Sequence, residues 1–511
     1  MARTAPLVWA PDRAAWALFW LACGLTLLIL QGRPTNADTS WGLTLGDAVL
    51  SGKTLYRDIL ETNPPMTVVL HLPAGLIARA TGLSAELAQQ LVTLAALLVS
   101  VVAATDILRA TGRARDAAGL IAAAAVFQLA PWINTFGERE QFAVMAMLPY
   151  VALWRPPGET GPRPWRAVLY AGIGGGLATA IKPVFCLCLI LPALHDMVAS
   201  RRLAPLLRPE HWIAAGVTGL YLLAAFLAFP GFFTDFSRIL ADTYFQYRMP
   251  LKDLLAKPEL GNLLLLAAVG WRQRNAPDTP AWATAATLCA LGFALAFVAQ
   301  AKGYLNHEMA VLSLGYMGVA GLIAPSALKA AADRRFGSLP LTVRLLGAPL
   351  LVFLTLWLYA QVAREVPYRS MALAAEAAQV PGAKTVLAIS PDLDIGHPLA
   401  RSAGLRYVGS TCSQWLSYTA MERKATAGAS PALRARMDGY MAADLGRLAQ
   451  DVRRARPDLI VLDRQSDFLA RYGPAAAPVR AALQAYHPVA RKNDVVLLAR
   501  NDLARTPSPA R

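Results

Sequence analysis

The chain is poor in charge and in cysteine. Only 16% of its 511 residues are Asp, Glu, Lys or Arg, whereas 56% are hydrophobic and the mean hydropathy is +0.39. This balance excludes an ordinary soluble protein of this length and indicates a polytopic membrane protein. Of the five cysteines, four lie inside apolar runs, and the sequence has no CxxC or Cys/His metal spacing. We therefore expect neither a disulfide framework nor a structural zinc site.

The sequence also lacks an internal repeat and a basic cluster. Its formal net charge is +16 at pH 7, but the Lys and Arg residues are scattered through short loops rather than gathered on one polar face. We therefore expect no nucleic-acid partner. Loop charges of this kind set the orientation of membrane helices.

Apolar runs of about 15–22 residues predict membrane-spanning helices, because roughly 20 apolar residues cross a bilayer. The first run, after Arg3 and Arg13, is longer than the roughly 7–15 apolar residues of a signal peptide, which favours an uncleaved helix. Eleven spans are predicted, at residues 14–31, 88–109, 116–133, 140–155, 166–181, 184–199, 211–230, 256–271, 281–300, 308–326 and 343–362.

Alternate loops between these spans differ in charge. One set is rich in Lys and Arg, whereas basic and acidic residues roughly balance in the other. The positive-inside rule places the basic set and the N-terminus in the cytoplasm. The balanced, outer set comprises residues 32–87, the turn NTFGERE, the Lys182-Pro183 junction, residues 231–255 and the turn QAKGYLNHE. An odd number of spans then puts the C-terminus outside, in the periplasm if the cytoplasmic membrane is that of a Gram-negative cell.

The composition changes to that of a soluble protein near residue 363. Four strand-like runs, TVLAIS, LRYVGS, LIVLD and VVLLAR, accompany an amphipathic helical pattern at 431–455. We therefore predict two domains. Residues 1–362 form a mainly α polytopic membrane domain with about 11 helices, and residues 363–511 form a small extracytoplasmic α/β domain.

Lys182 is the only charged residue in the apolar run from Leu169 to Leu194. Because Pro183 disfavours helix at the residue before it, we expect Lys182 at the outer tip between two helices. A charge inside an apolar run indicates a functional site, although a lysine at a helix tip could also snorkel to the interface. We expect the GIGGG run (172–176) to serve close helix packing instead of phosphate binding, since no strand precedes it.

The first outer loop, of about 55 residues, is far longer than the usual connection, and long loops are often functional. Asp38 follows the first span directly, and residues 40–50 have the apolar spacing of a helix on the membrane surface. The segment TNPPM then separates this helix from a second apolar one, VVLHLPAGLIA.

These landmarks resemble those of the GT-C glycosyltransferases, in the branch of the protein O-mannosyltransferases and lipid A aminoarabinose transferases. The likeness covers most of residues 14–326. Its motifs come in order along the chain, as Asp38, GKTLYRD, NPP, GERE (137–140), GGLATAIKP (175–183), TYFQYRM (243–249) and KGYLNHEMAVLS (302–313). The chain departs from the branch at Thr39, where Glu is usual, at Asn63, where Lys or His is usual, and at Pro183, where Gly is usual. The Tyr and Pro of the late motif are replaced at Asn306 or His307 and at Met309.

The resemblance implies a glycosyltransferase with a single inverting displacement. A sugar would move from a polyprenyl-phosphate donor to a hydroxyl of a glycolipid, glycan or protein acceptor at the outer face of the membrane. Asp38 would be the general base, whose alternative is a helix N-cap. Cations for the donor phosphate would be Lys182, Arg139, Arg248 and Lys302. Arg139 could instead pair with its flanking glutamates, and Arg248 and Lys302 could be snorkelling residues.

Six more residues are candidates for positioning the acceptor or its loop: Asp58, Glu61, Glu138, Glu140, Tyr247 and His307. The alternative for Asp58 and Glu61 is that they are solvated surface charges. The alternative for Glu138 and Glu140 is that acidic residues at a helix start interact favourably with the helix dipole without having any function. His307 and Glu308 supply too few ligands for a metal site. No metal or cofactor is therefore predicted, and the sequence leaves open whether a divalent metal assists phosphate binding. Membrane lipids are the remaining expected partner.

Three other functions fit parts of the pattern. A lipid-linked glycan ligase or polymerase shares the outer-face chemistry but usually carries its large loop late in the chain. A lipid or solute transporter would place its charges near the bilayer midplane and show repeats. An assembly scaffold would work through the outer α/β domain, where SPDLDIGHP carries Asp392, Asp394 and His397.

Overall fold

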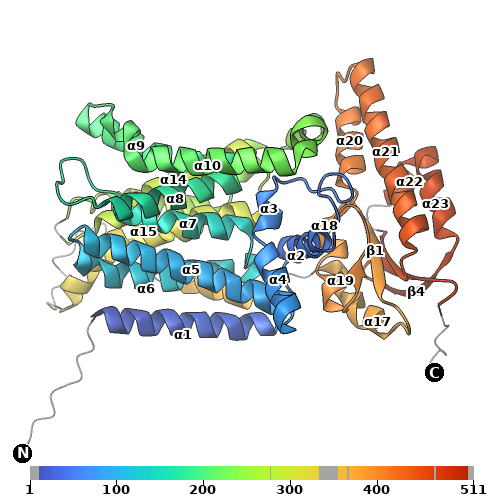
Figure 1. The fold of residues 1–511 in the computed structure, drawn as a ribbon, viewed down its shortest axis with the longest axis horizontal. Coiled ribbons are helices and arrows are strands. Elements are labelled where there is room, and N and C mark those ends of the chain that lie inside the picture. The colour runs from blue at the N-terminus through green and yellow to red at the C-terminus, as the bar shows by residue number, and fades with distance from the viewer. Residues whose placement is uncertain (1–10, 277, 333–354, 365–367, 465–467, 504–511) are drawn as a thin grey trace, which may run out of the picture. The chain divides into compact units, whose positions relative to one another are not determined.

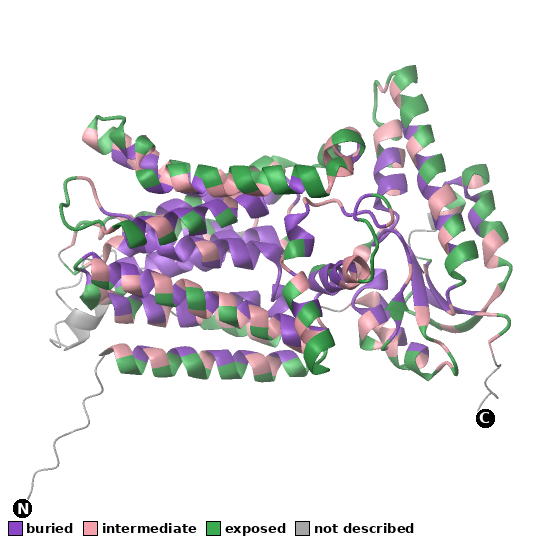
Figure 2. Cartoon of the chain, viewed as in Figure 1, coloured by how far each residue is buried: buried purple, intermediate pink, exposed green. Residues whose placement is uncertain are grey.

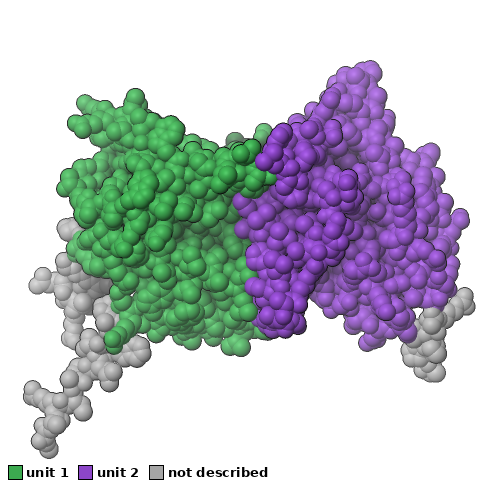
Figure 3. Space-filling view, viewed as in Figure 1, with its two compact units in different colours: residues 1–33, 90–224, 248–364 green, residues 34–89, 225–247, 365–511 purple. Residues whose placement is uncertain are grey.

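The protein folds into two compact units, which Figure 3 shows in different colours. The structure, a computed structural model, describes residues 11–276, 278–332, 355–364, 368–464 and 468–503. Unit 1 comprises Met1–Arg33, Gln90–Ala224 and Arg248–Arg364, and unit 2 comprises Pro34–Gln89, Ala225–Tyr247 and Glu365–Arg511. Unit 2 thus combines segments from both sides of the boundary predicted at residue 363.

Unit 1 is a bundle of apolar helices that run side by side (Figure 1). Its main helices are α1 (Pro11–Gln31), α5 (Ala85–Ala110), α6 (Ala117–Phe127), α7 (Arg139–Leu153), α8 (Trp165–Ile181), α9 (Leu187–Ser200), α10 (Pro209–Ala228), α12 (Leu251–Leu255), α13 (Pro258–Trp271), α14 (Ala281–Gln300) and α15 (Leu305–Ala332). All but the short α12 coincide with predicted spans. Of the last predicted span, 343–362, most residues lie outside the described part of the chain, which resumes with a helix at 355–363.

Seven helical segments among the described residues are long and apolar enough to cross a membrane, so the chain is a multi-pass membrane protein. They are residues 12–31, 85–110, 114–135, 183–200, 209–228, 281–300 and 305–325. Helices α7, α8 and α13 have 15, 17 and 14 residues. At about 1.5 Å per residue they are shorter than the roughly 30 Å hydrocarbon core of a bilayer. The count of eleven spans and the orientation stay predictions.

The helices of unit 1 differ in how deeply they are buried (Figure 2). In α15, 78% of the apolar window is buried inside the protein, and nearly every residue of α7 is buried as well. In α10 the share is only 11%, and Leu220, Leu223 and Leu227 are exposed. Contiguous exposed apolar side chains suit contact with lipid. Helices α7 and α15 therefore form the centre of the bundle, and α10 forms an outer face.

The glycine-rich run of α8 serves close packing, as predicted. A Cβ atom on Gly174 would lie 2.1 Å from the carbonyl oxygen of Ala146 in α7, and one on Gly176 would lie 2.6 Å from Cβ of Val217 in α10. Only glycine allows neighbouring helices to approach so closely. This packing fixes the position of α8, whose last residue precedes Lys182.

Unit 2 contains a five-stranded sheet in the order β2-β1-β3-β5-β4. Strands β1 and β2 pair in parallel, as do β1 and β3, whereas β5 is antiparallel to both β3 and β4. The strands are β1 (Thr385–Ile389), β2 (Arg406–Tyr407), β3 (Leu459–Asp463), β4 (Tyr486–Lys492) and β5 (Val495–Arg500). Four of the five coincide with predicted strands, and the helix α21 (Pro431–Ala455) covers the predicted amphipathic segment.

The helices of unit 2 come from both ends of the chain. The outer segments supply α2 (Ala37–Leu50), α3 (Met66–Val69), α4 (Leu72–Thr81) and α11 (Ser237–Asp242). The C-terminal part supplies α17 (Ala374–Gln379), α18 (Leu393–Gly396), α19 (Leu399–Ser402), α20 (Trp415–Ala425), α21, α22 (Phe468–Arg471) and α23 (Ala477–Leu483). Helix α2 covers the helix predicted at 40–50, but its apolar residues Trp41, Leu43 and Leu45 are buried inside the protein and do not form a membrane-surface face. Helices α3 and α4 correspond to the second predicted apolar helix.

The two faces of the sheet bury different partners, since side chains alternate along each strand. Leu387 and Ile460 pack with residues of α21 and α23. Val386 and Val461, on the other face, share a core with Trp41 and other residues of the first outer loop, and with residues of the segment 225–247. One face of the C-terminal sheet is therefore covered by the outer loops of the chain.

Candidate active site

Three helix ends in unit 1 bring polar residues to one place. Helix α7 begins after Glu138, and the Gln141 side chain accepts a hydrogen bond from the Gly137 amide at 2.8 Å, which fixes this start. Helix α8 ends at Ile181, and Lys182 takes an extended conformation (φ −146°, ψ 119°), as expected for a residue before proline. Helix α15 begins at Leu305. The predicted break at Lys182 is confirmed.

Glu140 is the centre of this polar cluster and is fully buried. Its Oε1 atom lies 2.5 Å from Lys182 Nζ, 3.1 Å from Arg139 Nε and 3.4 Å from His307 Nε2. Its Oε2 atom accepts a hydrogen bond from Asn306 Nδ2 at 3.1 Å. The local pairing foreseen for Arg139 is therefore present, but the same carboxylate also holds Lys182, which lies far away in the sequence.

Lys182 has further polar partners besides Glu140. Its Nζ atom donates to Gln300 Oε1 at 3.0 Å and lies 2.6 Å from His307 Nε2. A charged lysine can only donate, so His307 Nε2 accepts this hydrogen bond and the imidazole is the neutral Nδ1–H tautomer. The Lys182 side chain is only 11% exposed. Snorkelling alone does not describe it, because its ammonium group is enclosed by polar side chains from three other helices.

The two remaining predicted cations lie next to each other. Arg248 is exposed, and its Nη2 donates to the carbonyl oxygen of Ala299 at 2.8 Å, near the C-terminal end of α14. Lys302 is buried, and burial together with the charge of Arg248 lowers the pKa of Lys302 to about 8. Lys302 also interacts electrostatically with His307. Four cations thus belong to one region of unit 1.

The turn that carries Lys302 is shaped by Gly303. Gly303 has φ +68°, and a Cβ atom there would lie 2.5 Å from Met249 Cε. The Met249 amide donates to the carbonyl oxygen of Ala301 at 2.7 Å. These contacts fix the chain after Arg248 against the turn between α14 and α15.

Asp38, the predicted base, lies in unit 2 in the first turn of α2. It is exposed, whereas its neighbours Ala37 and Thr39 are buried. Its structural alternative, an N-cap, is occupied by Asn36, whose Oδ1 accepts from the Thr39 amide at 2.8 Å. A capping role therefore does not account for Asp38. Burial raises the pKa of the Cys412 thiol, and the charges of Glu61 and Asp38 raise this pKa further.

The two other carboxylates of the first loop have different surroundings. Glu61 is buried and accepts hydrogen bonds from Trp41 Nε1 at 2.5 Å and from the Asn63 amide at 2.8 Å, so it is not a solvated surface charge. Asp58 lies at the surface, where its hydrogen bonds with the Arg57 side chain and the Thr54 amide lower its pKa to about 2. The hydrogen bonds of both residues stabilise the loop. A role of either residue in positioning an acceptor stays a prediction.

Two candidates remain, Glu138 and Tyr247. Glu138 is buried at the start of α7, and Tyr247 is an exposed residue of unit 2. Sequence reasoning missed Gln300 and Asn306 as partners of the cluster. The only signal for them was a polar amide at the end of an otherwise apolar helix. Among the described residues, no group of three or more His, Cys, Asp or Glu side chains is arranged to hold a metal.

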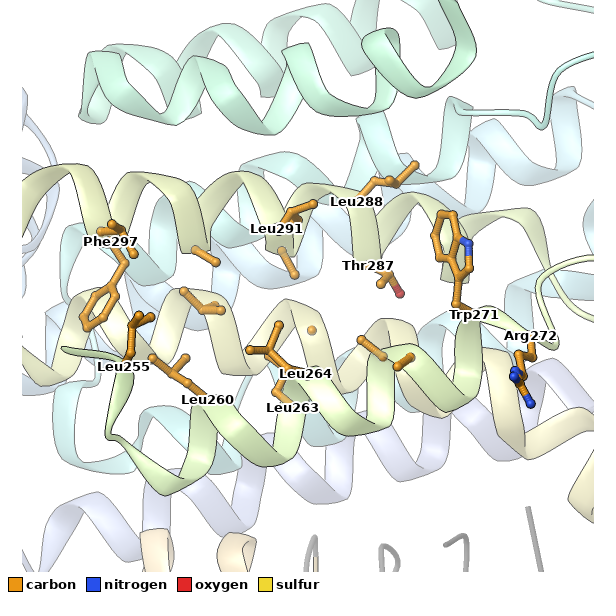
Figure 4. Close-up of a pocket in the computed structure, with 17 residues that line it drawn as sticks. Leu255, Leu260, Leu263, Leu264, Trp271, Arg272, Thr287, Leu288, Leu291 and Phe297 are labelled. Carbon is orange, nitrogen blue, oxygen red and sulfur yellow. The ribbon is translucent and has the colours of Figure 1, made fainter. Parts of the chain in front are cut away.

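An apolar groove of about 590 Å³ runs along α13, α14 and α15 (Figure 4). Leu255 and Phe297 line one end, Leu264 the middle, and Trp271 and Arg272 the other end. Phe297 is three residues before Gln300, which is about 4.5 Å along a helix, and Gln300 binds Lys182. The groove therefore begins beside the polar cluster and leads away from it.

Comparisons with known proteins give a likeness in structure. No protein-family model matches the chain, and no curated protein matches its sequence. ArnT from Cupriavidus metallidurans in the apo state aligns with a TM-score of 0.54 and 16% identity over 97% of this chain and 100% of that one. ArnT from the same organism bound to undecaprenyl phosphate gives 0.53 and 15% over 95% and 99%. An oligosaccharyltransferase from Archaeoglobus fulgidus in complex with zinc and sulfate overlaps more loosely, with a TM-score of 0.42 and 11% identity over 92% and 71%. The chain therefore has the fold of these ArnT structures, in agreement with the GT-C fold that its sequence motifs implied.

Proposed function

We propose that the chain is a GT-C glycosyltransferase that moves a sugar from a polyprenyl-phosphate donor to an acceptor hydroxyl at the outer face of the cytoplasmic membrane. The observation that carries this proposal is the cation cluster around Lys182 together with an apolar groove lined by Phe297, which lies three residues before the Lys182 partner Gln300. A polyprenyl phosphate has two matching parts: its phosphate is an anion that the cations can bind, and its long apolar chain can lie in the groove.

The cluster suits a phosphate because several cations gather in it. Glu140 is a single carboxylate that contacts two cations, Arg139 and Lys182. Lys302 and Arg248 add further positive charge nearby. Preorganised cations in a site sheltered from water stabilise the charge that develops on a leaving phosphate.

The groove suits an apolar chain because its lining is almost entirely hydrophobic. Thr287 and Arg272 are the polar exceptions among the lining residues, and Arg272 lies at the far end. A volume of about 590 Å³ is within the roughly 300–1,000 Å³ of ligand pockets. The likeness to ArnT bound to undecaprenyl phosphate supports the same class of donor.

In the proposed reaction Asp38 takes the proton of the acceptor hydroxyl as its oxygen attacks the anomeric carbon of the sugar. The bond between that carbon and the phosphate oxygen breaks, and the electron pair stays on the phosphate. Lys182 and Arg139 stabilise this negative charge. One displacement inverts the anomeric centre.

The test compares cell-envelope glycans. A strain lacking the gene is complemented with the wild type, with Asp38→Asn or with Asp438→Asn, a control at an exposed ion pair with Lys424. Mass spectrometry of glycolipids and surface polysaccharides is expected to show one sugar lost in the deletion strain. Wild type and the control restore it, and Asp38→Asn does not, although it reaches the membrane in equal amount.

Two outcomes would contradict the proposal at different points. Unchanged envelope glycans in the deletion strain would remove the glycosyltransferase assignment. Restoration by Asp38→Asn would keep the enzyme class but remove Asp38 as the base.

A further inference from the structure

Helix α2, which carries Asp38, is attached to the C-terminal part of unit 2 by a cluster of three buried rings that are tilted toward one another. The ring centroid of Trp41 lies 5.1 Å from that of His397 and 6.0 Å from that of Tyr407, and His397 and Tyr407 are 4.6 Å apart. Trp41 lies one helical turn after Asp38 and donates its indole N–H to Glu61. The ring cluster therefore fixes α2 within one helical turn of Asp38, the predicted base.

Two further contacts attach the ends of α2 to the same part of the chain. The Ala37 amide, at the start of the helix, donates to Tyr368 Oη at 3.2 Å. Near the end of α2, Asp47 forms an ion pair with Arg401 at 3.1 Å. Arg401 also pairs with Glu86 at the start of α5. Helix α2 is thus held at its start, middle and end, and it lies beside α18 in Figure 1.

The sheet also depends on this helix. Trp41 and Leu45 of α2 belong to the core that covers one face of the sheet, together with Val386 and Val461. The loop around Glu61 continues the attachment, because the Leu60 amide donates to the carbonyl oxygen of Ser410 at 2.8 Å. The C-terminal part and the first outer loop are therefore one packed body.

His397 has the properties of a packing residue. It is completely buried, and neither ring nitrogen has a hydrogen-bond partner among the described residues. Burial, with a smaller effect from the charge of Arg401, lowers the pKa of His397 to about 3. The imidazole is therefore neutral at physiological pH and presents a flat ring to Trp41.

We propose that the C-terminal α/β part of the chain is a positioning element for the base-bearing helix, in which His397, Tyr407 and Arg401 hold α2. These are positioning residues, since they act through Trp41 and Asp47 and not on a substrate. The inference rests on the proposed function for its catalytic consequence, but its structural part can be measured without any activity. It assigns the C-terminal part a role in the reaction of the membrane enzyme, in contrast to a separate scaffold.

The test uses the full-length protein in lipid nanodiscs and three variants. His397→Ala removes one ring of the cluster, and His397→Phe keeps a ring without nitrogens. Arg456→Ala, which removes an exposed ion pair with Asp502, is the control. Hydrogen–deuterium exchange of peptides covering residues 37–50 is measured together with kcat and the KM for the donor. His397→Ala is expected to speed exchange in α2 at least tenfold.

The same variant is expected to lower kcat roughly tenfold to a hundredfold, the size expected for a misplaced catalytic group, with the donor KM unchanged. His397→Phe and the control keep both values of the wild type. If His397→Ala does not fold, Arg401→Gln replaces it, with faster exchange expected at the end of α2.

Distinct results overturn the inference and the proposed function. Unchanged exchange of α2 in His397→Ala, or an inactive His397→Phe with normal exchange, would overturn the positioning role. Faster exchange in His397→Ala in a protein whose wild type transfers no sugar would leave the attachment intact and remove the glycosyltransferase.

Discussion

Two lysine–glutamate pairs in the helical unit, Lys182–Glu140 and Lys257–Glu308, start from the same sequence pattern and have different surroundings. Each lysine directly precedes a proline, Pro183 or Pro258, at the boundary of an apolar helix: Lys182 caps the C-terminal end of α8, and Lys257 caps the N-terminal end of α13. The Lys182 and Glu140 side chains are 11% and 0% exposed, whereas those of Lys257 and Glu308 are 25% and 4% exposed. The first pair is therefore the more completely removed from solvent.

The two pairs differ in the further polar groups around them, and these groups distinguish a candidate binding site from a structural ion pair. Glu140 also contacts Arg139 and Asn306, and Lys182 also contacts Gln300. A lysine in an apolar segment is costly wherever it lies, and one glutamate is enough to compensate it. A ligand site is indicated when more polar groups meet around the lysine than the one glutamate needed to compensate its charge. The Lys-Pro sequence pattern does not show whether such groups meet.

The largest expected effect separates the two glutamates. Glu140→Gln leaves two buried cations without their carboxylate, which should cost about 3–5 kcal/mol of stability. Glu308→Gln should cost less, because the side chain of Lys257 is a quarter exposed and can reach water. Thermal unfolding of both variants in the same detergent measures this. Equal losses would show that the two pairs are energetically alike.

The pH dependence of donor binding tests Lys302. Its pKa of about 8 means that the ammonium form predominates at pH 7 and the neutral amine at pH 9. If the cation binds donor phosphate, the KM for the donor should rise with pH through this range, by up to roughly tenfold, the change in the charged fraction. Lys302→Arg, which stays charged, should flatten the curve. The same slope in wild type and Lys302→Arg would assign the titration to another group.

The smaller of the stability effects concerns a neutral partner of Glu140. Asn306→Ala removes one hydrogen bond from the carboxylate while both cations remain, which should cost about 1–3 kcal/mol. The melting temperature should fall by less than in Glu140→Gln. A loss as large as that of Glu140→Gln would place the amide, and not the cations, at the centre of the cluster.

The sequence predicted the elements of the fold well, because their signals are local. Apolar length located the helices of unit 1, the amphipathic pattern matched α21, and the residue before Pro183 broke the helix as expected. Strand β4 was missed, since YHPVARK contains a proline and three basic or histidine residues. It lies at the edge of the sheet, where such residues are tolerated.

The candidate site could be predicted only in part. Charge on the outer loops led to Lys182, Arg139 and Lys302, but the meeting of Glu140, Gln300 and Asn306 depends on how distant helices pack. The N-cap role considered as the alternative for Asp38 falls on Asn36, two residues earlier, because Asn and Asp both cap helices well and a pattern fixes a helix start only to within a residue or two. The joining of the first outer loop to the C-terminal sheet had no signal in the sequence.

Binding of undecaprenyl phosphate to the purified protein tests the central claim most directly. Native mass spectrometry compares the wild type with Lys182→Met and with Lys257→Met, the matched lysine of the other pair. Loss of a charged contact to phosphate is expected to weaken binding by about 1.5–3 kcal/mol, which is tenfold or more. Lys182→Met should show this loss, and Lys257→Met should keep the wild-type affinity. Equal affinity of all three proteins would contradict the central claim.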